Sequence, residues 1–288
     1  MPELPEVETL RRELAAAITG KTIRAAHSDW PKMVKPLSIA AFSNNIKDQK
    51  ISAVRRRGKV LILDFTGALA LMIHLKLTGQ LIFQTRAGKA VFGGHPQTGS
   101  LDNLPNKFTH LTLVFSDGAK LFFNDMRKFG WARLVDDNHI PNLVEAMGPE
   151  PLTKDFTLDY LARVIKKYPK RKIKQILLDQ KLIGGIGNIY CDESCFCAKI
   201  LPGRPAAKIK PTEIKNLYRC INQVIKLAIA KKGTSADTYV RLNGKPGGMV
   251  PYLKVYGRQG EKCQRCGGTV ARLKLNGRGT HFCPKCQK

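Results

Sequence analysis

Apolar residues near the start of the chain recur with the period of a helix. Val7, Leu10 and Leu14 share one face over residues 5–18, and Gly20 marks the end of this predicted helix. Downstream, the pattern changes to short β-like runs separated by glycine-containing turns. Because these runs are closely spaced, they predict an antiparallel sandwich or barrel. The clearest runs are Ile51–Arg57, Val60–Phe65, Leu69–Leu75, Gln80–Phe83, Leu111–Phe115, Lys120–Asn124 and Trp131–Val135.

Helical periodicity returns in the second half of the chain, so the fold class is α+β with more than one domain. The four expected helices cover about 157–167, begin after Pro169, begin near Asn188, and cover about 212–231. A glycine-rich stretch, residues 232–248, follows the last of them.

Two segments show no periodicity. Residues 85–106 are expected to form a long loop or a small insertion. Residues 136–153 are rich in proline and polar residues, which is typical of a linker. The predicted division is a β domain (1–135), a linker (136–153), a helical domain (154–250) and a cysteine-rich module (251–288).

The charge of the chain points to a polyanionic partner. Its 288 residues include 49 Lys+Arg and 22 Asp+Glu, which gives a formal net charge of +27. Nucleic acid is the simplest partner for such an imbalance. No membrane partner is expected, because the longest apolar stretch, residues 68–73, is far too short to span a bilayer. The start of the chain lacks the apolar core of a signal peptide, so a cytoplasmic protein is expected.

Four cysteines near the end of the chain have the spacing of a zinc site. Cys263-x2-Cys266 and Cys283-x2-Cys286 are separated by sixteen residues, so two knuckles with a hairpin between them can offer four thiolates. All four ligand positions would be protein sulfur, so we predict one structural Zn²⁺ and no catalytic metal. Arg278, at the predicted hairpin tip, is a candidate for contacting DNA.

The other four cysteines carry a different prediction. Cys191, Cys195, Cys197 and Cys220 lie in helical patterns, and disulfides are rare in cytoplasmic proteins. They are therefore expected to be free thiols that pack as small apolar residues.

The first residues of the chain are candidates for covalent chemistry. If Met1 is removed, the ring nitrogen of Pro2 becomes a free secondary amine that can condense with an aldehyde carbon to give an iminium. Glu3 and Glu6 are neighbouring proton carriers. A purely structural interpretation assigns Pro5 to the first helical turn and Glu6 to the helix dipole, but it leaves Pro2 and Glu3 unexplained.

A glycine-rich turn in the helical half is a candidate for contacting phosphate. Gly184, Gly185 and Gly187 allow close approach of the backbone, and Asn188 opens the next helix. A basic run that includes Lys170 and Lys174 lies just upstream and suits a DNA-binding edge. The alternative is a tight helix connection, with Asn188 as N-cap and the lysines on a solvated face.

Together, these motifs resemble the bacterial formamidopyrimidine-DNA glycosylase family, relatives of endonuclease VIII. The resemblance spans nearly the whole chain, with its motifs in sequence order. They are Met1–Glu8, Arg57–Lys59, His74-Leu75, Asn124–Gly130, Gly185–Tyr190, Val255–Arg258 and Gly279–Cys286.

The resemblance implies an N-terminal β-sandwich preceded by a helix, then a helix–two-turn–helix domain with a zinc-bound β-hairpin. Damaged double-stranded DNA would lie between the domains, and the protein would be a monomer. The implied activity is removal of oxidised purines, such as 8-oxoguanine and formamidopyrimidines, followed by cleavage of the abasic strand. Residues 232–248 would close over the everted base.

The resemblance also implies roles for individual residues. Pro2 would be the nucleophile at the sugar C1′, Glu3 the acid that helps release the base, and Glu6 a carboxylate near the nucleophile. Lys59 would contact phosphate and serve β-elimination. Lys170, Asn188 and Arg278 would hold phosphates, with Arg278 also serving δ-elimination. Arg127 and Phe129 would enter the duplex, and His74 precedes a further inserting position.

Two positions depart from the pattern of the family. Leu77 occupies the place of an inserting methionine, and Phe108 that of a phosphate-contacting histidine, for which His110 could substitute. These departures bear on the lesion and opposite-base preferences. Two alternative functions therefore stay open: an endonuclease VIII-like glycosylase for oxidised pyrimidines, and a zinc-dependent protein that binds damaged DNA without cutting it.

Overall fold

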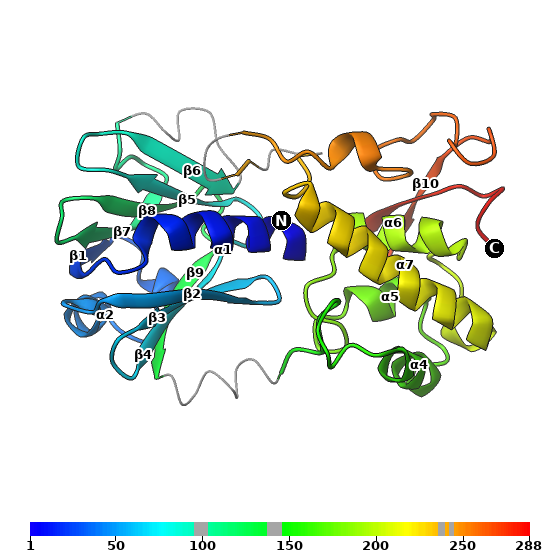
Figure 1. Ribbon diagram of the computed structural model, residues 1–288, viewed down its shortest axis with the longest axis horizontal. Coiled ribbons are helices and arrows are strands. Elements are labelled where there is room, and N and C mark those ends of the chain that lie inside the picture. Colours follow the sequence, from blue (N-terminus) through cyan, green and yellow to red (C-terminus); the bar gives the residue numbers. More distant parts are fainter. Residues whose placement is uncertain (95–102, 137–145, 236–239, 242–244) are drawn as a thin grey trace. The chain divides into compact units, whose positions relative to one another are not determined.

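A computed structural model describes residues 1–94, 103–136, 146–235, 240–241 and 245–288 (Figure 1). The chain forms two compact units. Unit 1 comprises Met1–Val144 and Lys232–Gly248, and unit 2 comprises Glu145–Lys231 and Met249–Lys288. The sequence-based division placed residues 232–248 in the helical domain, whereas their contacts group them with unit 1.

Unit 1 contains two antiparallel sheets. The order in the five-stranded sheet is β1-β7-β8-β5-β6, and in the four-stranded sheet β2-β3-β4-β9. The first sheet comprises β1 (Ile23–Ser28), β7 (Thr109–Phe115), β8 (Lys120–Asp125), β5 (Gly79–Gln84) and β6 (Ala90–Gly94). The second comprises β2 (Ile51–Arg57), β3 (Val60–Phe65), β4 (Leu69–His74) and β9 (Trp131–Asp136).

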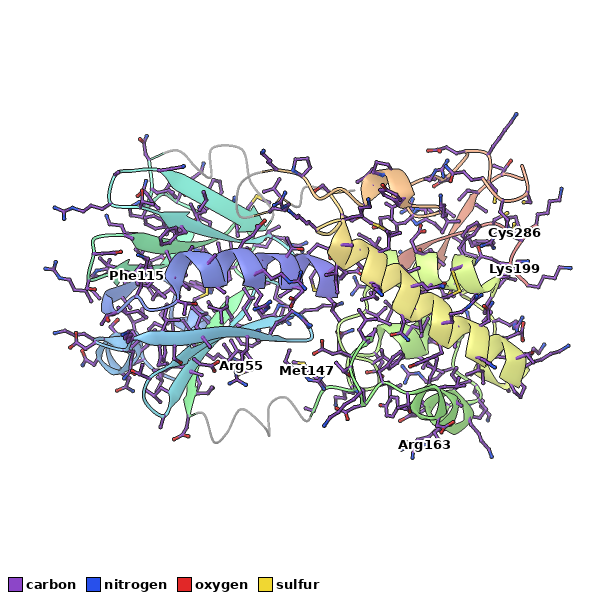
Figure 2. The ribbon with its side chains drawn as sticks, in the orientation of Figure 1. Arg55, Phe115, Met147, Arg163, Lys199 and Cys286 are labelled. Carbon is purple, nitrogen blue, oxygen red and sulfur yellow. A yellow bond between two sulfur atoms is a disulfide. The ribbon has the colours of Figure 1, made fainter. Side chains whose placement is uncertain are left out.

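The two sheets share one core, so unit 1 is the predicted β-sandwich. Leu63 of β3, Leu113 of β7 and Phe115, which is labelled in Figure 2, belong to a single cluster of buried side chains. Helix α1 (Leu4–Ile18) adds Leu10 and Leu14 to this cluster from its apolar face. The apolar face of α1 therefore anchors this helix, and with it the start of the chain, on the sandwich core.

In the described part of unit 1, strand β1, strand β6 and helix α2 (Ile39–Ile46) were not predicted. Strand β1 and helix α2 are short, and only Phe42 and Ile46 of α2 are buried, which is too few for a periodic signal. Strand β6 lies inside the segment 85–106, which was predicted to be a loop, and it pairs with β5. The rest of that prediction lies partly outside the described residues.

The described residues of unit 2 include the four predicted helices and a hairpin. They are α4 (Leu158–Lys167), α5 (Ile173–Leu178), α6 (Asn188–Ala198), α7 (Pro211–Ala230), β10 (Ala271–Leu275) and β11 (Arg278–Phe282). The short 3-10 helices are η1 (Pro31–Met33) in unit 1, and η3 (Ala206–Lys208) and η4 (Val250–Tyr252) in unit 2. Helix α6 is the most enclosed of the four, because it packs on both α7 and β11. No helix in the described part of the chain is long and apolar enough to cross a membrane.

The cysteines of the helices require a correction. Cys197 of α6 and Cys220 of α7 form a disulfide, so the expectation of free thiols is wrong for this pair. The packing of α6 on α7 brings their Cα atoms to 5.7 Å, within the range that a disulfide can bridge. Cys191 and Cys195 are free and buried, as expected.

Candidate functional site

The first residues of the chain after Met1 are buried. Pro2 is buried, and Glu3 and Glu6 are only 3% and 2% exposed. Glu3 is the N-cap of α1, and its backbone N–H donates to Glu6 Oε2 at 2.9 Å. The helix therefore begins immediately after the candidate nucleophile and holds its position.

Glu6 also connects α1 to the segment that follows α7. Its Oε1 accepts a hydrogen bond from the backbone N–H of Thr234 at 2.7 Å. The approach is close, because a Cβ added to Gly233, which has a φ of +81°, would lie 2.9 Å from the same oxygen. Glu6 thus satisfies two backbone donors at once, a structural role that the sequence suggested only for the helix start.

Lys59 and His74 lie at the ends of neighbouring strands. Lys59 follows Gly58 in the turn between β2 and β3 and is only 6% exposed, so it is not an ordinary surface lysine. Burial, together with the positive charges of Lys76 and Lys59, lowers the pKa of His74 to about 3. The imidazole is therefore neutral near pH 7, and its Nδ1 accepts from the Lys76 N–H at 2.9 Å.

Asp125 organises the two loops that carry the predicted inserting residues. Its Oδ1 accepts from the hydroxyl of Thr78 and, at 3.2 Å, from the N–H of Arg127. Its Oδ2 accepts from the N–H of Gly130 at 2.6 Å. The turn containing Leu77 and the loop containing Arg127 are consequently fixed to one buried carboxylate. Asp125 had been noted only as part of a motif, without a role.

The inserting candidates themselves differ in exposure. Phe129 is 52% exposed, so its ring is accessible and is not part of the sandwich core. The Arg127 guanidinium lies 4.8 Å from the centre of the Phe129 ring, so the two side chains form one exposed cation–π pair. Leu77 is half-buried.

His110 does not replace the histidine that is missing at position 108. Its Nδ1 lies 2.9 Å from Asp29 Oδ1 and its Nε2 lies 3.1 Å from the Asp125 carbonyl, so both ring nitrogens have partners in a buried site. Phe108 is half-buried, and Lys107 Nζ lies 5.2 Å from the centre of its ring. The suggested substitution by His110 is therefore wrong.

In unit 2, Asn188 binds the zinc hairpin instead of capping its own helix. Gly187 is the N-cap of α6, and Asn188 Nδ2 donates to the Gly279 carbonyl at 2.9 Å. Asn188 Oδ1 is buried and has no hydrogen-bond partner among the described residues. The N-cap interpretation is thus wrong, and the side chain lies against the residue that follows Arg278.

The basic run before α5 is only partly exposed. Lys174 is 1% exposed, and its Nζ lies 2.6 Å from Asp192 Oδ1 and 3.2 Å from the Gly279 carbonyl. Arg171 pairs with Asp179 at 3.1 Å. Lys174 therefore cannot belong to a DNA-binding edge, whereas Arg171 is half-buried and Lys170 is exposed.

The four predicted zinc ligands come together. The Sγ atoms of Cys263, Cys266, Cys283 and Cys286 lie within 4.8 Å of one another. The pairs Cys263–Cys286 and Cys266–Cys283 are 3.8 and 3.6 Å apart. Four thiolates at the usual Zn–S distance form a tetrahedron with an edge of about 3.8 Å, so the donor set fits one structural Zn²⁺. Arg278, at the start of β11, is exposed.

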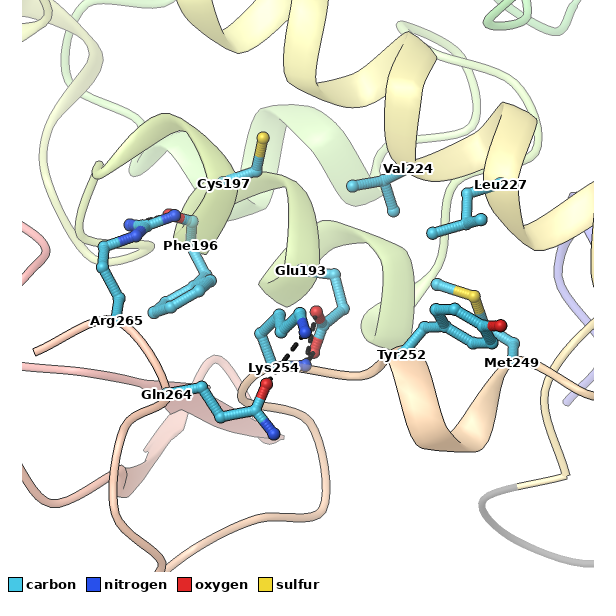
Figure 3. A pocket seen from close by; sticks show the side chains of 10 residues that line it. All are labelled: Glu193, Phe196, Cys197, Val224, Leu227, Met249, Tyr252, Lys254, Gln264 and Arg265. Carbon is cyan, nitrogen blue, oxygen red and sulfur yellow. Dashed lines mark hydrogen bonds between the residues drawn. The ribbon is translucent and has the colours of Figure 1, made fainter. Parts of the chain in front are cut away.

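A pocket of about 380 Å³ in unit 2 involves none of the predicted site residues (Figure 3). Glu193 lines it, but its carboxylate accepts the backbone N–H groups of Lys254, Val255 and Tyr256. Burial raises the pKa of Glu193, and these three hydrogen bonds oppose that shift. The carboxylate therefore holds the segment before the zinc module on α6.

The fold and the site define a class of protein. Residues 1–132 match the formamidopyrimidine-DNA glycosylase N-terminal domain, and residues 147–240 match the H2TH domain of the same glycosylase. Residues 260–288 match the zinc finger found in FPG and IleRS. The chain therefore belongs to the formamidopyrimidine-DNA glycosylase family.

Individual relatives match over their full length. The formamidopyrimidine-DNA glycosylase of Carboxydothermus hydrogenoformans is 39% identical, with 100% of both chains covered. That of Pelotomaculum thermopropionicum is 38% identical, with 100% of this chain and 99% of the relative covered. The structure of Lactococcus lactis Fpg with DNA containing an abasic site gives a TM-score of 0.88 at 36% identity, covering 99% of each chain. The L. lactis protein has also been solved with DNA containing an oxidised pyrimidine, at a TM-score of 0.86 and 35% identity over 100% of both chains.

Proposed function

We propose that the protein is a base-excision-repair DNA glycosylase and abasic-site lyase that acts on oxidised purines in double-stranded DNA. The observation that carries this proposal is the buried start of the chain, where Pro2 and Glu3 immediately precede a helix anchored in the sandwich. Full-length relatives named formamidopyrimidine-DNA glycosylase support the same reaction. The proposal includes action in the cytoplasm, at the nucleoid, as a monomer.

The chemistry follows from a free Pro2 amine. Its nitrogen forms a bond to C1′ while the bond to the damaged base breaks, and Glu3 supplies a proton that helps to open the sugar. The resulting iminium acidifies the C2′ proton. Loss of that proton expels the 3′ phosphate by β-elimination, with Lys59 beside the reacting strand. A δ-elimination then releases the 5′ phosphate, a step assigned to Arg278.

The remaining candidates bind and distort the duplex. Eversion of a base costs unstacking energy, which phosphate contacts and inserted side chains must supply. Lys170, Asn188 and Arg278 are assigned to the phosphates. Arg127, Phe129, Leu77 and, beside them, His74 and Phe108 are assigned to the opened base pair. Glu6 holds the residue-232–235 segment, where a base-capping loop begins.

Borohydride trapping tests the proposal. A duplex with one 8-oxoguanine opposite cytosine should give a covalent adduct, and Pro2→Gly or a form that retains Met1 should give none. An adduct only with a thymine-glycol duplex would favour the pyrimidine alternative. Tight binding without any adduct would favour the non-catalytic alternative, and a Met1-retaining form that still cleaves abasic DNA would refute Pro2 as the nucleophile.

A further inference from the structure

Lys76 has a backbone conformation that lysine rarely adopts. Its φ is +51°, in the left-handed region, and it directly precedes the inserting candidate Leu77. In this region the Cβ of an L-residue crowds the following carbonyl oxygen, a penalty that glycine does not have. Such residues persist where surrounding contacts hold them, and they concentrate at functional sites.

The surroundings of Lys76 do hold it. Its N–H donates to His74 Nδ1 at 2.9 Å, and the turn closes with the Gly79 N–H donating to the Leu75 carbonyl at 2.9 Å. The backbone is tightly packed at Gly79, because an added Cβ would lie 2.3 Å from that carbonyl oxygen. Thr78 is fixed to Asp125. The turn is therefore rigid, and it carries a lysine at a position where glycine would be less strained.

Lys76 also contributes charge next to a predicted catalytic lysine. Strand β3 begins just after Lys59, and it pairs with β4 so that Leu61 lies opposite Ile73. Lys59 and Lys76 therefore flank the same end of this strand pair. Both positive charges lower the pKa of His74, the last residue of β4. Lys59 is buried and Lys76 is half-buried, so solvent screens these charges less than it screens those of ordinary surface lysines. An anion bound beside His74 would gain from both charges.

We propose that Lys76 is a further DNA-binding residue, which contacts a backbone phosphate of the damaged strand together with Lys59 and fixes the register of the Leu77 turn on that strand. A phosphodiester is the anion that the proposed substrate presents there, and lysine binds phosphate as a compact point charge. This inference rests on the proposed function.

The test compares variants for binding to a duplex that carries a tetrahydrofuran abasic analogue, over a series of salt concentrations. Lys76→Gln and Lys76→Gly should each weaken binding about tenfold at low salt, the usual scale for one charge-assisted contact. Each should reduce the slope of log K against log salt by about 0.9, the value for one phosphate. Lys76→Arg should retain most of the affinity. Lys76→Gly should also raise the melting temperature, because it relieves the left-handed strain, so its loss of affinity cannot come from unfolding.

Lys199→Gln is the matched control, because Lys199 is exposed and has a φ of +61° but lies in unit 2, at the end of α6. It should bind with the slope of the parent protein. An unchanged slope in Lys76→Gln would overturn the inference. Borohydride trapping by the parent protein separates the two failures: a parent that traps DNA while Lys76→Gln binds normally refutes only the role of Lys76.

Discussion

At the scale of single residues, Glu6 and Glu13 of α1 have different roles although they lie only about two helical turns apart. Glu6 is buried and accepts two backbone N–H groups, from Glu3 and Thr234. Glu13 is more exposed and forms a salt bridge with Arg241 at 2.7 Å. Both residues connect α1 to the segment after α7, so comparing them separates a buried acceptor of backbone N–H groups from a partly buried ion pair.

Glu6→Gln should loosen that segment more than Glu13→Gln does. A glutamine at position 6 keeps one acceptor and turns an NH₂ group toward a backbone donor, which costs about 1–3 kcal/mol. The Glu13–Arg241 pair is only partly buried, and a glutamine at position 13 leaves no backbone donor without its acceptor, so the cost there should be smaller. NMR hydrogen exchange at the Thr234 amide should therefore accelerate strongly in Glu6→Gln and little in Glu13→Gln, and excision should slow in the same order. Equal exchange rates in the two variants would refute the anchoring role of Glu6.

Glu8 gives a pH dependence with a defined sign. Partial burial alone would raise its pKa, but the guanidinium groups of Arg11, Arg12 and Arg56 outweigh burial and lower the pKa from 4.5 to about 2. A lowered pKa in the folded state stabilises the protein above pH 4.5, and this contribution disappears as the pH falls toward 2. Glu8→Gln should cost about 1–2 kcal/mol at pH 7, after allowing for solvent screening. Denaturant unfolding at both pH values tests this: a difference that persisted at pH 2 would contradict it.

At the scale of elements, the sequence predicted those whose residues are regular and long enough to show a period. The bounds of β2 and β3 agree with their apolar runs, and α1 agrees within one residue. Helix α2 was missed because eight residues with two buried side chains do not define a face. The disulfide between Cys197 and Cys220 was missed because it depends on how two helices pack, which spacing along the chain does not reveal.

The site shows the same division between local pattern and packing. The zinc ligands were predictable because two knuckles are local motifs with fixed spacing. Lys174 was misassigned because a run of charges does not show which member turns inward to meet Asp192. Asp125 was not assigned, since its role depends on Thr78, which lies on a different loop.

Asp125→Asn should impair base eversion more than the later chemistry. The amide would put a donor where the carboxylate accepts from Arg127 or Gly130, so both inserting loops would lose a fixed position. We expect kcat/KM to fall about 10- to 100-fold on a paired 8-oxoguanine, the scale of a buried hydrogen bond to a charged group. The defect should shrink when the lesion lies opposite a missing base, because no pair then has to be opened. An equal defect on both substrates would mean that Asp125 acts only through the stability of the fold. Thr78→Val is the control, because it removes only one of the hydrogen bonds to Asp125.

At the scale of the whole molecule, the zinc module and the sandwich have separate clusters of buried side chains. Cys283 and Cys263 belong to a small buried cluster with Phe196 of α6, whereas the core of the sandwich is built from unit 1 alone. Cys283→Ser should therefore lose zinc, detach the hairpin that carries Arg278, and abolish DNA binding while the sandwich stays folded. Metal analysis, near-UV circular dichroism and gel-shift assays measure the three effects. Unchanged affinity in a zinc-free variant would refute the structural role of the metal.

The net charge of +27 is a property of the whole molecule, and it predicts a steep salt dependence of binding. Each phosphate that the protein neutralises releases counterions, so log K should fall with log salt by about 0.9 per contact. The candidates Lys59, Lys170 and Arg278 alone imply a slope near −3, and Lys76 would add one more contact. Removal of one phosphate contact should reduce the slope of log K against log salt by about 0.9 and leave the discrimination between damaged and undamaged DNA unchanged. Arg127→Ala should instead change this discrimination more than it changes the slope. Fluorescence anisotropy with abasic-analogue and undamaged duplexes at several salt concentrations distinguishes these effects. A flat salt response with the parent protein would mean that the positive charge of the chain serves a partner other than DNA.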